Sequence, residues 1–85
     1  MTLPEFNQMP FEDRRAFVLG NKKLRLKYYR YYYNQKVSLF EMNDFFIEVY
    51  YLPAREMITN IRGIGKEDEI LEIYLEQMSK LSCWT

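Results

Sequence analysis

Two apolar strands joined by a two-residue turn constrain the fold of this chain more than any other feature. Residues 36–42 and 45–52 are rich in β-branched and aromatic side chains, which favour extended strands. Between them stands Asn43-Asp44, a pair that suits a two-residue β-hairpin turn. The chain is therefore predicted to be built around an antiparallel hairpin.

The turn also decides which side chains share a face of the sheet. If Met42 faces Phe45, then Phe40 faces Ile47, and a slip of one residue would exchange the two faces. One face then carries Phe40, Met42, Phe45, Ile47, Val49 and Tyr51. The other carries Val37, Leu39, Glu41, Phe46, Glu48, Tyr50 and Leu52. Both faces are largely apolar, whereas a sheet with one solvated side alternates, so we expect both faces to be covered.

The N-terminal residues have helical signals that are interrupted once. Thr2 and Glu5 have the spacing of a capping box. Pro10 interrupts the helix, because the residue before a proline avoids helical backbone angles. Residues 11–19 continue as a helix with acids in its first turn, as the helix dipole favours. Gly20-Asn21 predicts a left-handed stop.

Two further strands are predicted on either side of the hairpin. Apolar and charged residues alternate in residues 23–29, so the apolar residues of this strand are predicted to share one face. The turn that joins this strand to the hairpin lies somewhere in residues 30–35. After a proline-containing turn at 53–56, residues 57–62 form the last strand, and two glycines end it.

The end of the chain returns to helical spacing. Acids at 67–69 open the helix, and its apolar stripe consists of Ile70, Leu71, Tyr74, Leu75, Met78 and Leu81. The sequence therefore predicts one α+β domain over residues 1–85. It comprises an N-terminal helix, an antiparallel β-meander of three to four strands, and a C-terminal amphipathic helix. Both helices are predicted to lie on the same face of the sheet.

Basic residues are concentrated in one segment, although the formal net charge of the chain is zero. Residues 14–40 contain eight basic residues and no acid, and five tyrosines stand among the last of them. Strand-presented aromatics stack on bases while Lys and Arg contact phosphates, so segment 22–36 is a candidate for binding single-stranded nucleic acid. That surface would consist of Arg25, Lys27, Tyr29, Arg30, Tyr31, Tyr33 and Lys36. A pI of 6.3 and the acidic strands that follow favour a protein interface instead.

No catalytic motif accompanies these features, and the chain is predicted not to be an enzyme. The sequence has no histidine, which excludes His-based nucleophile pairs and His-ligated metals, and no metal or cofactor is expected. Glu41 and Glu48 share a predicted face and are expected to pair with basic residues of neighbouring strands, although a buried carboxylate pair would be a site candidate. Residues 63–66 lack the spacing of a phosphate-binding loop. Cys83 is expected to be an inert thiol.

The chain is expected to be soluble and cytoplasmic. A single cysteine excludes an internal disulfide framework and suits a reducing compartment. The first residues lack the basic and apolar regions of a signal peptide. No apolar run approaches the roughly 20 residues that a membrane-spanning helix needs.

Four segments of the chain resemble small bacterial proteins that consist of a helix, a β-meander and sometimes a final helix. The similar residues are 6–12, the two hairpin strands at 37–40 and 44–51, and Ile61-Arg62. The resemblance implies the same α-β-meander fold and adds nothing about chemistry.

The favoured function is a small protein-interaction module that self-associates through its sheet. Two helices committed to one face would leave the other exposed, and large exposed apolar patches mark interfaces. The predicted interface consists of Val37, Leu39, Phe46, Tyr50 and Leu52. The expected partner is a second copy in a homodimer, or another protein, with nucleic acid as the alternative and no membrane.

Overall fold

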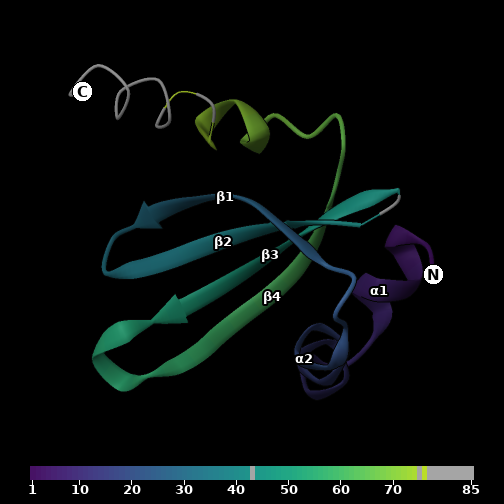
Figure 1. Ribbon diagram of the computed structural model, residues 1–85, viewed down its shortest axis with the longest axis horizontal. Coiled ribbons are helices and arrows are strands. Elements are labelled where there is room, and N and C mark those ends of the chain that lie inside the picture. Colours follow the sequence, from purple (N-terminus) through teal and green to yellow (C-terminus); the bar gives the residue numbers. More distant parts are fainter. Residues whose placement is uncertain (43, 75, 77–85) are drawn as a thin grey trace.

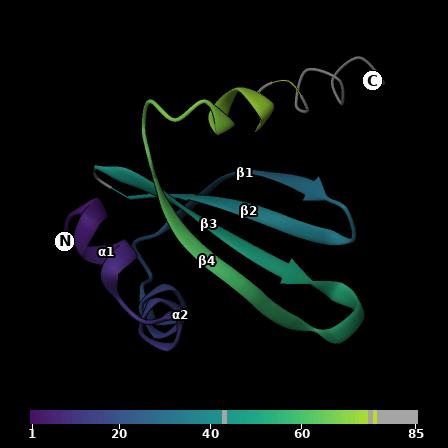
Figure 2. The same ribbon diagram turned by 180° about the vertical axis from the view of Figure 1, so that it is seen from behind.

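A four-stranded antiparallel sheet lies between two helical layers. The computed structural model describes residues 1–42, 44–74 and 76. The elements are α1 (Leu3–Gln8), α2 (Phe11–Gly20), β1 (Arg25–Tyr32), β2 (Gln35–Glu41), β3 (Phe45–Leu52), the short 3-10 helix η1 (Pro53–Arg55) and β4 (Met57–Gly65), followed by a short helix at 70–74. The strands lie side by side in the order β1-β2-β3-β4, with the N-terminal helices and the helix at 70–74 on opposite sides of them (Figures 1 and 2). The predicted α+β fold with a β-meander is confirmed.

The central hairpin has the register that its turn predicted. Phe40 lies opposite Ile47, and Ser38 lies opposite Val49. The Met42 N–H donates to the Phe45 carbonyl oxygen at 2.9 Å, which closes the hairpin next to the turn. Asn43, the first turn residue, lies outside the described residues.

The face of the sheet that we call the first face packs against α1 and α2. Its core consists of Phe6, Phe45, Ile47, Val49 and Ile61. The Phe6 ring lies 5.7 Å from the Phe17 ring and 5.8 Å from the Phe45 ring, so both helices meet the sheet through aromatic contacts. The predicted helix start is confirmed, because Thr2 and Glu5 form the capping box.

The helix at 70–74 covers the opposite face, which we call the second face. Tyr74 is buried there against Val37, Leu39 and Ile64. The prediction that both helices share one face is therefore wrong. The second face carries apolar residues beside its charged ones, and the first face is already occupied by the N-terminal helices, so the last helix gains most by burying its apolar residues on the second face. The remaining members of the predicted stripe, Leu75, Met78 and Leu81, lie outside the described residues.

Strand β1 begins and ends later than predicted and contains a bulge. Its register shifts between Leu26, which lies opposite Phe40, and Tyr28, which lies opposite Leu39. The bulge inserts one extra residue and places Leu26 and Tyr28 on different faces, so the prediction of one shared face is wrong. The turn to β2 lies at residues 33–34, with Tyr33 in a left-handed conformation at φ 55°.

Two glycine predictions are also wrong. Strand β4 continues through Gly63 to Gly65. A Cβ on Gly63 would lie 2.6 Å from Leu3 Cδ1 and 3.2 Å from Phe6 Cδ2, so this glycine allows α1 to approach the strand. The end of α2 contains no left-handed residue, since Asn21 is extended with φ −101° and no glycine has positive φ.

Candidate functional site

The second face contains a buried charged network centred on Glu48. The Glu48 side chain is 0% exposed, and its oxygens accept from Arg62 Nε at 2.6 Å and Arg30 Nη2 at 3.3 Å. The Tyr74 and Tyr50 hydroxyls donate to the same carboxylate at 2.5 and 3.3 Å. Four donors therefore surround one carboxylate, as a buried charge requires.

The network links β3 to three other elements, namely β1, β4 and the helix at 70–74. Arg30 comes from β1, Arg62 from β4 and Tyr74 from the helix at 70–74. Burial raises the pKa of Tyr74 and of Tyr50, and the neighbouring Glu48 carboxylate raises both further. Both phenols therefore stay protonated and act as donors. The arrangement is suited to holding the elements of the second face together, because the Glu48 carboxylate is enclosed and both of its oxygens accept hydrogen bonds.

The expected pairing of the acids with basic residues of other strands is confirmed. Glu41 and Glu48 share the second face as predicted. Glu48 pairs with Arg30 and Arg62, and Glu41 lies 3.8 Å from the Lys27 ammonium. Sequence analysis did not identify Arg62 or Tyr74 as partners. The sequence feature that could have indicated them is Glu48 itself. It is a single acid in an otherwise apolar strand, and a buried carboxylate needs donors from the elements around it.

The residues predicted as an interface are largely covered within one chain. Val37 and Leu39 are 0% exposed beneath Tyr74, and Phe46, Tyr50 and Leu52 are half-buried. The premise that this face lacks a covering helix is therefore wrong, and Val37 and Leu39 do not form an exposed surface. Association through this set of residues stays a prediction that would require the helix at 70–74 to move.

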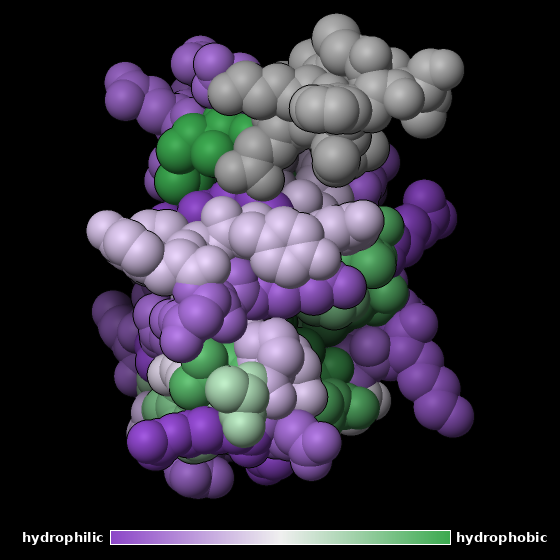
Figure 3. Space-filling view, turned by 90° about the vertical axis from the view of Figure 1, so that its left-hand side faces the viewer, coloured by the Kyte–Doolittle hydropathy of each residue, from purple (hydrophilic) through white to green (hydrophobic). Residues whose placement is uncertain are grey.

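Exposed aromatic residues gather instead on β1 and its turn. Tyr29, Tyr31, Tyr32 and Tyr33 are exposed, with Tyr31 at 63% and Tyr33 at 88%. Tyr29 and Tyr31 pack edge to face with ring centres 6.0 Å apart, and the Lys36 ammonium lies 4.5 Å from the Tyr29 ring centre. Figure 3 shows a band of side chains of intermediate hydropathy across the end of the sheet where β1 turns into β2.

The two edges of the sheet differ in their unpaired backbone groups. On β4, Asn7 pairs with the backbone of Gly63 in both directions, accepting from its N–H at 2.8 Å and donating to its carbonyl at 3.1 Å. The Ile61 N–H donates to the Asn60 side chain at 2.9 Å. Side chains thus engage the outer backbone groups of β4 at Ile61 and Gly63. Within the described part of the chain, no side chain bonds to the backbone of β1, so its outer edge is open.

The residues predicted to bind nucleic acid do not form one surface. Arg30 is buried against Glu48, and Lys27 lies beside Glu41. Tyr29, Tyr31 and Lys36 do share the first face. The requirement that the arginine and lysine residues all accompany the tyrosines is not met, because alternation along β1 directs Arg30 to the opposite face.

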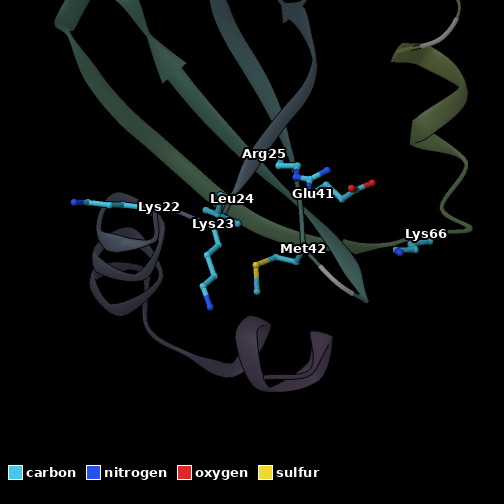
Figure 4. Close-up of a pocket in the computed structure, with 7 residues that line it drawn as sticks. All are labelled: Lys22, Lys23, Leu24, Arg25, Glu41, Met42 and Lys66. Atoms are coloured by element: carbon cyan, nitrogen blue, oxygen red, sulfur yellow. The ribbon is translucent and has the colours of Figure 1, made fainter.

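A basic cleft lies at the other end of β1. It has a volume of about 590 Å³ and is lined by Lys22, Lys23, Leu24, Arg25, Glu41, Met42 and Lys66. These residues come from the loop before β1, the first residue of β1, the end of β2 and the turn after β4 (Figure 4). Sequence analysis grouped Lys22 to Arg25 as basic but did not place Lys66 beside them.

Among residues 1–42, 44–74 and 76, no three acidic, histidine or cysteine residues are grouped as metal ligands. Helices in that part of the chain are all too short or too polar to cross a bilayer. Cys83 lies outside the described residues.

Comparisons with protein families, with curated proteins and with solved structures give no match, so function has to be argued from the surfaces themselves. The resemblance to small bacterial α-β-meander proteins stays a prediction.

Proposed function

We propose that this protein is a small, non-enzymatic interaction module that pairs with a second copy of itself through the open edge of β1. Pairing two β1 strands would join two four-stranded sheets into one continuous sheet. The proposal keeps association through the sheet but moves it from the second face to an edge. The observation that carries it is an open, tyrosine-rich edge opposite an edge closed by side chains.

The contrast between the edges supports this choice. Unpaired strand edges invite pairing with another chain, and proteins that avoid pairing protect them with side chains, charges or bulges. Asn7 and Asn60 protect β4. The first half of β1 is also protected, by Arg25, Lys27 and the bulge. Residues 28–32 have no such protection.

The sequence of this half-strand suits pairing with itself. In an antiparallel pair related by a two-fold axis at Arg30, Tyr29 of one copy would lie opposite Tyr31 of the other. Aromatic cross-strand pairs stabilise sheets by about 0.2–1 kcal/mol each. The zero net charge removes repulsion between copies, and a short chain gains stability by burying more surface.

Tyr33 gives a second indication that this end of β1 has a function. Its backbone has φ 55°, a region that side chains other than glycine enter at a cost, and its ring is exposed. Its place in a two-residue hairpin turn accounts for this backbone angle, so the exposed ring is what supports a contact here. A contact with a second copy would use the ring that the isolated chain leaves in water.

The decisive experiment is sedimentation of the wild type and of Tyr31→Lys over a series of concentrations up to high micromolar. We expect the wild type to dimerise and Tyr31→Lys to stay monomeric, because the substitution removes the aromatic pair with Tyr29 of the other copy and adds a charge to the paired edge. Tyr31 is 63% exposed, so the variant should fold normally by circular dichroism.

The matched control is Met57→Lys, which adds the same charge to an exposed residue of the closed strand β4. It should dimerise like the wild type. A monomeric wild type at high micromolar concentration, or equal loss of dimer in both variants, would refute pairing through β1. The module is proposed to act in the cytoplasm, which its single cysteine supports.

Binding of single-stranded nucleic acid is a second candidate, favoured by the cation that stacks on an exposed ring at Lys36 and Tyr29. A titration with a fluorescent oligonucleotide at low salt tests it. Affinity should fall steeply with added salt, because binding releases counterions. Absence of binding at low salt would end this candidate.

A further inference from the structure

We propose that the basic cleft at the start of β1 binds ligands that carry two or more linked phosphate groups. This site is separate from the proposed pairing edge, since it lies before the bulge and the edge lies after it. Four cationic side chains and one carboxylate line the cleft. Its volume of about 590 Å³ is that of a small-ligand site and exceeds what a single phosphate fills.

The charge balance of the cleft favours an anion. Lys22, Lys23 and Arg25 have no ion-pair partner within the part of the chain that the structure describes. The carboxylate of Glu41 lies 3.8 Å from the Lys27 ammonium, so Lys27 partly neutralises the one negative charge in the cleft. A multiply charged anion in the cleft would therefore meet a surplus of positive charge.

The backbone that presents these cations is held in place. The Lys23 N–H donates to Asn21 Oδ1 at 2.9 Å, which fixes the turn after α2. Leu24 packs against the core of the first face and anchors the same loop. Because folding already fixes this backbone, part of the entropy cost of gathering the charges is met before a ligand binds.

The kinds of donor point to phosphate rather than to a carboxylate alone. Arg25 offers a planar fork that matches two phosphate oxygens, and the lysines act as point charges toward further oxygens. Figure 4 shows Arg25 beside Glu41 at the centre of the cleft, with Lys66 on one side and Lys23 on the other. Cations spread in this way suit a chain of phosphates better than one compact anion. The apolar surface from Leu24 and Met42 is small, so phosphates would supply most of the contact.

Calorimetric titration of the full chain with tripolyphosphate at an ionic strength of about 0.1 M tests the site. We expect saturable binding with one site per chain, and weaker binding of sulfate at matched ionic strength. The double variant Lys23→Gln/Arg25→Gln should lose about tenfold or more in affinity, as expected for loss of charge-assisted contacts. Arg55→Gln, an exposed arginine in η1 at the far end of the sheet, should change the affinity less than about twofold, because exposed charges beyond a Debye length are screened.

Competition identifies the source of the phosphates. Displacement of tripolyphosphate by a nucleoside triphosphate but not by an oligonucleotide would indicate a small ligand, and displacement by an oligonucleotide would indicate a nucleic-acid backbone. Either result supports a phosphate site. The proposal is overturned if tripolyphosphate does not bind, or if Arg55→Gln weakens it as much as the cleft variant does. Repeating the titration with Tyr31→Lys, at concentrations where the chain is monomeric, separates failure of this site from failure of the pairing edge.

Discussion

Replacement of Glu48 by glutamine should destabilise this protein more than the same replacement of an acid in an exposed ion pair. Glu48→Gln keeps the shape of the side chain but removes the charge. The Arg30 side chain is only 6% exposed, so its guanidinium would remain buried without a counter-charge. Arg30 Nε is already a buried donor with no hydrogen-bond partner among the described residues. The glutamine amide would in addition present a donor to groups that are themselves donors.

The expected loss follows from the exposure of each partner. Removing one member of a buried ion pair costs about 3–5 kcal/mol in free energy of unfolding. The Arg62 side chain is 43% exposed and can be hydrated once released, so its share should be below about 1 kcal/mol. A chain of this size has a total stability of about 4–13 kcal/mol. Glu48→Gln should therefore remove a large part of the stability.

Urea unfolding followed by circular dichroism measures this loss. The matched control is Glu41→Gln, which removes the same group from a half-exposed pair at 3.8 Å and should cost less than about 1 kcal/mol. Adding Arg30→Met to Glu48→Gln should restore part of the stability, because it removes the stranded charge. Equal, small losses in Glu48→Gln and Glu41→Gln would refute the buried network.

Three further outcomes test other parts of the structure. Tyr74 has a raised pKa in the fold because of burial and Glu48, so its contribution to stability is complete below the ordinary phenol pKa of 10.0 and is lost as the pH rises above it. Tyr74→Phe should therefore lose less stability than the wild type between pH 10 and 11, measured as urea midpoints; the same loss in both would contradict the raised pKa. Gly63→Ala should lower stability by about 1–3 kcal/mol, since the new Cβ meets Leu3 and Phe6; an unchanged melting temperature would argue against the contact with α1. Gly20→Ala should raise stability by up to about 1 kcal/mol, because Gly20 is helical with open space around it; a loss would indicate a left-handed helix end after all.

Local rules explain what could be predicted from sequence. The capping box at Thr2, the break at Pro10 and the register of the central hairpin each depend on neighbouring residues and a fixed side-chain period. The register also placed Glu41 and Glu48 on one face correctly. The tyrosine-rich and basic surface could be predicted in part, because the tyrosines and basic residues of segment 22–36 are close together in the chain.

The sequence by itself thus determined that the chain forms a meander, the faces of its hairpin and the concentration of tyrosines in one segment. Only the tertiary structure decided which face the last helix covers, that Arg30 is buried on Glu48, and that Asn7 closes the edge of β4. These features join residues that are 18 to 56 positions apart. No local sequence pattern specifies such contacts. Their free energy depends on which apolar surface is still exposed, and which backbone groups still lack hydrogen-bond partners, after the rest of the chain has folded.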